Sequence, residues 1–176
     1  MRDLAGFWPE FLARGGRGLS ITAPLKEQAA ALARAPDADV VESGAANTLL
    51  ADGRAANTDL RAFLECIPAG SGAALVMGAG GSARAAVVAL RRLGYAVRIW
   101  ARRPEQAREL GDAAARPEPA DVVVNTTPVP APETPYLVDL RYGELANDGS
   151  AKVDGRQFLL TQARHQYRLF TGGELD

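Results

Sequence analysis

A glycine-rich turn between an apolar strand and a helix constrains the fold of this 176-residue chain more than any other segment. The run Ala73–Met77 is continuously apolar, as expected for a strand buried in a parallel sheet. It leads directly into GAGGSA, Gly78 to Ala83, which fits the dinucleotide-binding pattern G-x-G-x-x-G/A and opens a helix expected over residues 81–93. This order of strand, turn and helix predicts a phosphate-binding turn.

The small residues of the turn have separate physical tasks. Gly78 permits the tight turn, Gly80 lets a pyrophosphate approach the backbone, and Ala83 keeps the helix close to the strand. The first turn of the helix offers free N–H groups and a partial positive charge to the phosphates. The alternative is a glycine-rich turn of an α/β fold without this ligand. The predicted cofactor-binding residues of the turn are Gly78, Ala79, Gly80, Gly81 and Ser82.

Strands and helices alternate after the turn. Further strands are expected over 95–101, 121–125 and 136–140, with a helix opened by Pro104 and a last helix over 156–170. This alternation predicts an α/β fold with a Rossmann-like, doubly wound parallel sheet. The ligand site of such a sheet lies beyond the carboxyl ends of its strands.

The residues before this sheet follow a different pattern. Residues 46–50 and 54–58 flank Ala51-Asp52-Gly53, which is a hairpin signal. The other elements expected in this part are a broken or short helix within 2–17, a strand over 19–23, a helix over 25–34, a loop at 36–39 and a helix over 59–67. We expect a smaller α/β substrate lobe over residues 1–68, completed by a C-terminal helix within 155–176, and a cofactor lobe over 69–154.

The end of the second strand of the cofactor lobe indicates which dinucleotide binds. NAD sites carry an Asp or Glu there for the ribose 2′-hydroxyl. This chain has Ala101-Arg102-Arg103 and no acid, and two guanidinium groups suit a 2′-phosphate. NADP is therefore favoured over NAD. The alternative is a solvated arginine pair, since 18 of the 20 basic residues are arginine.

Composition excludes several classes of function. A net charge of −1 argues against non-specific nucleic-acid binding, and no apolar run is long enough for a membrane span. The single cysteine, Cys66, and the single histidine, His165, leave no intrachain disulfide and no Cys/His metal cluster, so we expect no metal. The first residues lack the apolar core of a secretory signal. A cytoplasmic protein is expected.

Several segments, in order along the chain, resemble motifs of the shikimate dehydrogenases, and the chain is identified as a member of that family. The similar segments are GLSITAPLK (18–26), AANT (45–48), NTD (57–59), GAGGSARA (78–85), ARR (101–103), NTTP (125–128), DLRY (139–142) and the run from DG (154–155) to LFTG (169–172). The resemblance implies an NADP-dependent oxidoreductase of aromatic amino acid biosynthesis that interconverts 3-dehydroshikimate and shikimate, or a related cyclic hydroxy acid.

The resemblance also implies roles for individual residues. Lys26 and Asp59 would form the catalytic acid–base pair. The substrate-binding residues would be Thr22, Asn47, Tyr142 and Gln162, and those binding the cofactor besides the turn would be Ala101, Arg102, Arg103, Thr126, Thr127, Leu140 and Gly155.

The proposed pair also has a physical logic of its own. An ammonium group beside a carboxylate can polarise a carbonyl oxygen and donate a proton to it. The alternatives are that Lys26 is a solvated residue of a first helical turn and that Asp59 is a helix N-cap. Asn47 could instead satisfy hairpin backbone, and Gln162 could be a surface or capping residue.

Two departures from the family pattern limit the resemblance. The family carries a Ser-x-Ser pair for the substrate carboxylate in a region before the first motif, whereas this sequence begins after that region, and Ser20 replaces the usual Asn. We therefore expect a shortened member. Two alternatives are a non-catalytic NADP-binding protein and one part of a split enzyme. Without the missing strands, the strand over 19–23 would have an unpaired edge, so a homo-oligomer, most simply a two-fold dimer, is expected to cover it.

Overall fold

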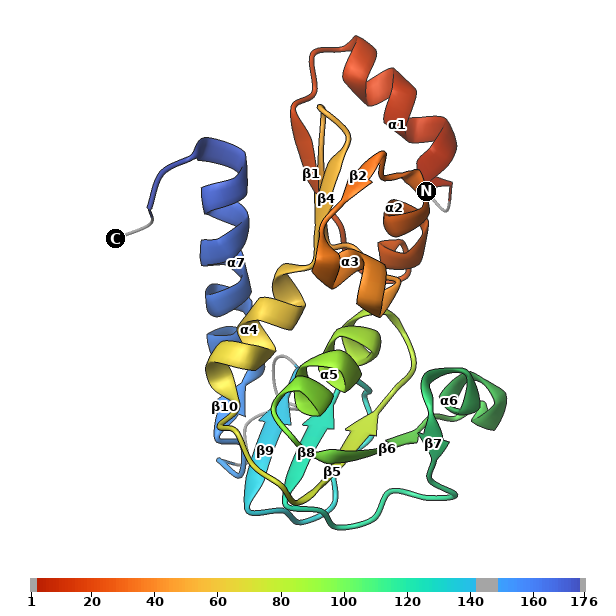
Figure 1. Ribbon diagram of the computed structural model, residues 1–176, viewed down its shortest axis with the longest axis vertical. Coiled ribbons are helices and arrows are strands. Elements are labelled where there is room, and N and C mark those ends of the chain that lie inside the picture. Colours follow the sequence, from red (N-terminus) through yellow and green to blue (C-terminus); the bar gives the residue numbers. More distant parts are fainter. Residues whose placement is uncertain (1–2, 142–148, 175–176) are drawn as a thin grey trace.

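The protein contains two β-sheets with helices packed between and beside them (Figure 1). The computed structural model describes residues 3–141 and 149–174. A four-stranded sheet has the order β1-β3-β4-β2, and a six-stranded sheet has the order β10-β9-β8-β5-β6-β7. The parallel six-stranded sheet and the separate smaller α/β unit confirm the predicted fold class.

The six-stranded sheet is parallel at every pairing, with β5 in its middle. Its strands are β5 (Ala73–Met77), β6 (Ala96–Trp100), β7 (Asp112–Ala113), β8 (Val122–Asn125), β9 (Tyr136–Asp139) and β10 (Val153–Asp154). Alternate residues of β5 lie in different cores: Val76 packs in the helix-covered cluster, whereas Leu75 and Met77 pack with Val123 on the other face. Both faces are buried, which explains the unbroken apolar run in the sequence.

The four-stranded sheet forms the smaller lobe. Its strands are β1 (Gly18–Ser20), β2 (Ala35–Pro36), β3 (Thr48–Leu50) and β4 (Arg54–Ala56), and its helices are α1 (Leu4–Ala13), α2 (Lys26–Leu32) and α3 (Ala38–Ser43). The β3–β4 hairpin confirms the turn predicted at Asp52-Gly53. A core that includes Leu4, Ile21 and Leu49 joins the sheet to α1 and α2.

Four further helices complete the fold: α4 (Thr58–Cys66), α5 (Gly81–Arg92), α6 (Pro104–Leu110) and α7 (Gly155–Thr171). In Figure 1, α7 rises from β10 to lie beside the small sheet, with α4 between α7 and α5. The rings of Phe63 on α4 and Phe158 on α7 have centroids 4.4 Å apart. The last helix, α7, is thereby fixed to α4, the first helix that follows the smaller lobe.

No helix among the described residues is long and apolar enough to cross a bilayer.

Several short elements differ from the sequence prediction. The loop expected at 36–39 contains the start of α3, where the Asp37 side chain accepts a hydrogen bond from the Val40 backbone N–H. The N-cap of α4 is Asn57, whose side chain accepts from the Leu60 N–H, so the interpretation of Asp59 as the cap is wrong. The sequence pattern did not predict β2, β7 and β10, because each of these strands has only two residues and therefore shows no alternating pattern.

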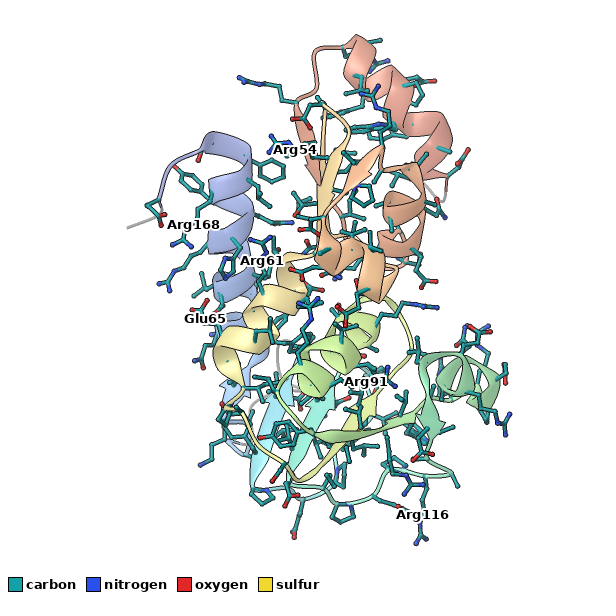
Figure 2. All side chains as sticks on the ribbon, in the orientation of Figure 1. Arg54, Arg61, Glu65, Arg91, Arg116 and Arg168 are labelled. Atoms are coloured by element: carbon teal, nitrogen blue, oxygen red, sulfur yellow. The ribbon has the colours of Figure 1, made fainter. Side chains whose placement is uncertain are left out.

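The arginines of α5 contact neighbouring elements. Arg92 pairs with Asp39 (2.7 Å) and with Glu42, both on α3, and this fastens the smaller lobe to α5. Other arginines are spread over the surface: Figure 2 shows Arg54 beside the small sheet and Arg116 at the opposite end of the molecule.

Replacing Phe63 by alanine tests the packing of α7. Phe63 is fully buried against Phe158, so Phe63→Ala should lower the free energy of unfolding by about 3–5 kcal/mol, measured by urea denaturation. Val41 is 69% exposed, and Val41→Ala should change stability by less than about 0.5 kcal/mol. Equal effects of the two substitutions would contradict this account of the core.

Candidate functional site

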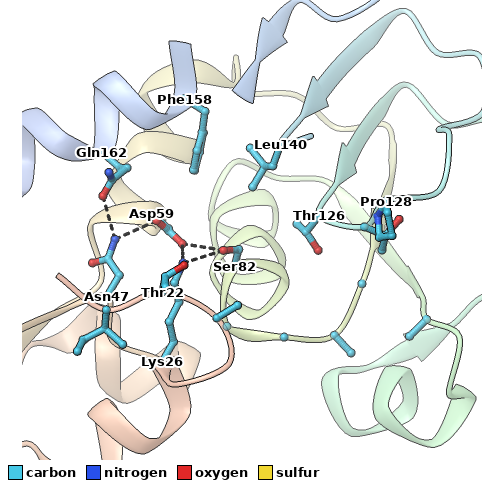
Figure 3. Close-up of a pocket in the computed structure, with 18 of the residues that line it drawn as sticks. Thr22, Lys26, Asn47, Asp59, Ser82, Thr126, Pro128, Leu140, Phe158 and Gln162 are labelled. Atoms are coloured by element: carbon cyan, nitrogen blue, oxygen red, sulfur yellow. Dashed lines mark hydrogen bonds and ion pairs between the residues drawn. The ribbon is translucent and has the colours of Figure 1, made fainter. Parts of the chain in front are cut away.

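A cavity of about 480 Å³ opens between the two lobes, beyond the carboxyl ends of β5, β6, β8 and β9. The smaller lobe contributes the segment around Thr22 and Lys26, and the larger lobe contributes the glycine-rich turn (Figure 3). α7 adds Phe158 and Gln162 from the end of the chain. Segments from both ends of the sequence therefore form one cavity at the edge where parallel sheets bind ligands.

The glycine-rich turn has the geometry that a dinucleotide phosphate needs. Gly78 has φ +118°, and a Cβ there would lie 2.1 Å from Thr126 Oγ1. Gly80, the N-cap of α5, makes no side-chain cap, and a Cβ there would meet open space. The first N–H groups of α5 have no intrahelical partner, and Gly80, Gly81 and Ser82 line the cavity, so this helix start fits a pyrophosphate.

The end of β6 provides positive charge on the same cavity. Ala101, Arg102 and Arg103 line it together with Gln106 of α6, and the two arginines are exposed. Among the described residues, neither arginine has an acidic side chain within ion-pair distance. The pair can therefore accept an external phosphate group without first breaking an internal salt bridge.

Lys26 and Asp59 form an ion pair in this cavity (Figure 3). Lys26 is the first residue of α2, and Asp59 lies in the first turn of α4. Their exposed fractions are only 9% and 4%. The interpretation of Lys26 as a solvated helix residue is therefore wrong, and the structure brings the two sequence-predicted groups together across a separation of 33 residues.

Both carboxylate oxygens of Asp59 accept further hydrogen bonds. Asn47 Nδ2 donates to Oδ1 at 2.9 Å. Ser82 Oγ donates to Oδ2 at 2.9 Å, and Lys26 Nζ donates to Ser82 Oγ at 2.8 Å. This set of partners supplies donors to both oxygens of the buried carboxylate.

Two glutamines of α7 extend the network. Gln162 Oε1 accepts from Asn47 Nδ2 (3.2 Å) and from Thr58 Oγ1 (3.1 Å). Gln166 Nε2 donates to the Asn47 carbonyl (2.8 Å), and Gln166 Oε1 accepts from Ser20 Oγ (3.1 Å). Gln162 therefore lies on a buried helix face. Gln166 and Ser20 were not predicted as site residues, although Gln166 follows Gln162 by one helical turn.

The remaining predicted residues have different locations. Thr22, Thr126, Thr127 and Leu140 line the cavity with the residues already described. Gly155 does not line it: a Cβ there would lie 2.6 Å from the Arg141 carbonyl oxygen, so this glycine permits a close backbone approach. Tyr142 lies outside the described residues.

Cys66 offers no alternative nucleophile in this cavity. It lies at the end of α4, lines a different depression beside Tyr136, and packs against the helix-covered core. Burial raises the pKa of its thiol, which disfavours the thiolate. The chemistry of the main cavity therefore depends on Lys26, Asp59 and their partners.

Comparison with known proteins identifies the family. No protein-family model matches the chain. The shikimate dehydrogenase (NADP(+)) of Thermus thermophilus is 36% identical over 194 residues, an alignment that covers 90% of this chain and 74% of the relative. That of Anaeromyxobacter dehalogenans is 37% identical over 203 residues, covering 91% and 73%. The chain belongs to the shikimate dehydrogenase family.

Solved structures of shikimate dehydrogenases agree with this assignment. That of Aquifex aeolicus superimposes with a TM-score of 0.84 at 28% identity, covering 98% of this chain and 79% of the other. That of Thermus thermophilus, in complex with NADP(H) and shikimate, gives a TM-score of 0.78 at 34% identity, with coverage of 98% and 79%. The resemblance seen in the motifs is confirmed, and the protein is an oxidoreductase of the shikimate dehydrogenase type.

Proposed function

We propose that this protein is an NADP-dependent oxidoreductase that interconverts 3-dehydroshikimate and shikimate, or a related cyclic hydroxy acid. The observation that carries the proposal is the buried Lys26–Asp59 pair, which faces the same cavity as the dinucleotide-type turn. Named relatives that are NADP(+)-dependent shikimate dehydrogenases support it.

The residues of the larger lobe fit NADP. The N–H groups at the start of α5 would hold the pyrophosphate, and Arg102 and Arg103 would pair with the 2′-phosphate. Thr126 and Leu140 line the cavity where the chain leaves β8 and β9, and would bound the nicotinamide end. NADP, when bound, exchanges a hydride with the carbon that carries the secondary alcohol.

Lys26 and Asp59 handle the proton that accompanies the hydride. During reduction, Lys26 Nζ polarises the substrate carbonyl oxygen and donates a proton to it as the alcohol forms. Asp59 holds the ammonium group in place and stabilises its positive charge, while Asn47 fixes the orientation of the carboxylate. In the reverse direction the same pair receives the proton of the alcohol.

The smaller lobe and α7 would bind the hydroxylated ring. Thr22 is exposed at the mouth of the cavity, and Gln162 and Asn47 present polar atoms at its inner wall. Asn47 and Gln162 already bond to each other, so hydroxyl groups of a substrate would join an ordered network. Tyr142 stays a candidate from the sequence resemblance alone.

Removal of the Lys26 amine should abolish proton transfer. We expect Lys26→Met to lower kcat by about 10²- to 10⁴-fold in NADPH-monitored turnover, because the substitution removes the proposed proton donor. Lys152 is the other lysine of the chain and is exposed, so Lys152→Met is the matched control and should retain full activity.

Two results would contradict parts of this proposal. Full activity in Lys26→Met would exclude the acid–base role. Tight NADP binding by a wild-type protein that turns over none of a panel of cyclic hydroxy acids would favour the alternative, a dinucleotide-binding protein without catalysis.

Cofactor choice should depend on the arginines at the end of β6. Replacing both Arg102 and Arg103 by alanine should weaken NADP binding by about 10- to 100-fold, because charge-assisted bonds to the 2′-phosphate are lost. Isothermal titration calorimetry measures both affinities, and NAD binding should change by less than about threefold. Arg116→Ala, at an 81% exposed side chain away from the cavity, is the control. Equal losses for both dinucleotides would rule out selection by these residues.

We further propose that two copies of the chain associate through β1. In its antiparallel pairing with β3, the Arg17 carbonyl and the Ile21 N–H bond to the β3 side, which directs the backbone groups of Gly18 and Ser20 to the open edge. β1 is the end strand of its sheet, and such edges favour pairing. Multi-angle light scattering at micromolar concentration should give the mass of two chains, and a monomer mass would exclude this association.

A further inference from the structure

The hydroxyl group of Ser82 connects the dinucleotide turn to the acid–base pair. Ser82 Oγ accepts a hydrogen bond from Lys26 Nζ at 2.8 Å and donates one to Asp59 Oδ2 at 2.9 Å. The three side chains form a closed triangle, since Lys26 also bonds to Asp59 (Figure 3). A serine hydroxyl has one proton to donate and lone pairs to accept with, so these two bonds match its capacity.

This contact brings together helices from both lobes. Lys26 begins α2, whereas Ser82 is the second residue of α5. Gly81 makes the approach possible: a Cβ at this position would lie 2.6 Å from Lys26 Cβ. The glycine before Ser82 therefore lets the lysine stem pack directly on the dinucleotide turn.

The hydroxyl of Ser82 has no competing structural task at the helix start. The N-cap of α5 is Gly80, and no side chain caps this helix. The backbone N–H of Ser82 belongs to the first turn, where N–H groups lack intrahelical partners. One residue thus offers its N–H toward the cofactor phosphate and its hydroxyl to the pair.

We propose that Ser82 is a positioning residue that orients Lys26 and Asp59 for proton transfer; this rests on the function proposed above. Without the hydroxyl, the ammonium group loses its bond to Ser82, and Asp59 Oδ2 loses this donor. The lysine would then sample orientations that do not reach the substrate oxygen, which lowers kcat while leaving the phosphate-binding N–H groups unchanged.

Two substitutions at Ser82 test the proposal through kinetics. Ser82→Ala should lower kcat by roughly 10-fold, as expected for loss of a hydrogen bond to a charged group, with KM for NADP within about threefold of wild type. Ser82→Thr keeps the hydroxyl and should retain most of kcat. Ser71→Ala, at an exposed loop serine before β5, should have no effect. An unchanged kcat in Ser82→Ala, or a rise in KM with no change in kcat, would overturn the proposal.

A chemical readout makes the result independent of turnover. Limited acetylation with acetic anhydride, followed by mass spectrometry, gives the extent of modification of Lys26 relative to the exposed Lys152 within one molecule. Loss of the bond from Lys26 Nζ to Ser82 should raise this ratio roughly 5- to 10-fold in Ser82→Ala. Ser82→Thr should leave the ratio near the wild-type value. An unchanged ratio in Ser82→Ala would overturn the proposed contact.

The two readouts separate this proposal from the proposed function. A protein that turns over no substrate, but whose Lys26 modification rises in Ser82→Ala, would contradict the enzymatic function and support the contact. An active enzyme in which neither kcat nor the modification ratio responds to Ser82→Ala would support the function and overturn the positioning role.

Discussion

The buried ion pair between Lys26 and Asp59 is the interaction on which the rest of the site depends. Removing two charges from water is costly, and the cost is offset only when each charge has close partners. Asp59 has Asn47 on one oxygen and Lys26 with Ser82 on the other. The hairpin, α2, α4 and α5 must therefore all be in place before this pair is stable.

The fold meets this requirement by directing three helix N-termini to one point. Lys26, Asp59 and Ser82 each lie in the first turn of a helix, respectively α2, α4 and α5. Helix N-termini carry partial positive charge, so their convergence favours the Asp59 carboxylate and the phosphates of a dinucleotide alike. The same helix starts therefore serve both the ion pair and the phosphate-binding turn.

Local sequence signals predicted the elements whose structure depends on a few neighbouring residues. The apolar run before Gly78 and the hairpin at Asp52-Gly53 were read correctly from their own segments. The pairing of Lys26 with Asp59 was expected from the family motifs, since nothing in the local pattern of either segment specifies it.

Other features depend on tertiary contacts that no local pattern contains. The whole of α3 was missed because a helix of six residues lacks a clear period. Asn57 is the N-cap of α4 in place of Asp59, whose carboxylate pairs with Lys26 from a distant segment. The roles of Gln166 and of the Ser82 side chain require the separate lobes to be in contact.

The return of α7 to the smaller lobe has a consequence for how the protein is made. Asn47 is synthesised more than a hundred residues before Gln162 and Gln166, which complete its hydrogen bonds at separations of 115 and 119 residues. During translation these hydrogen bonds of Asn47 must therefore wait for α7, and the network at the inner wall is complete only after the last helix has docked.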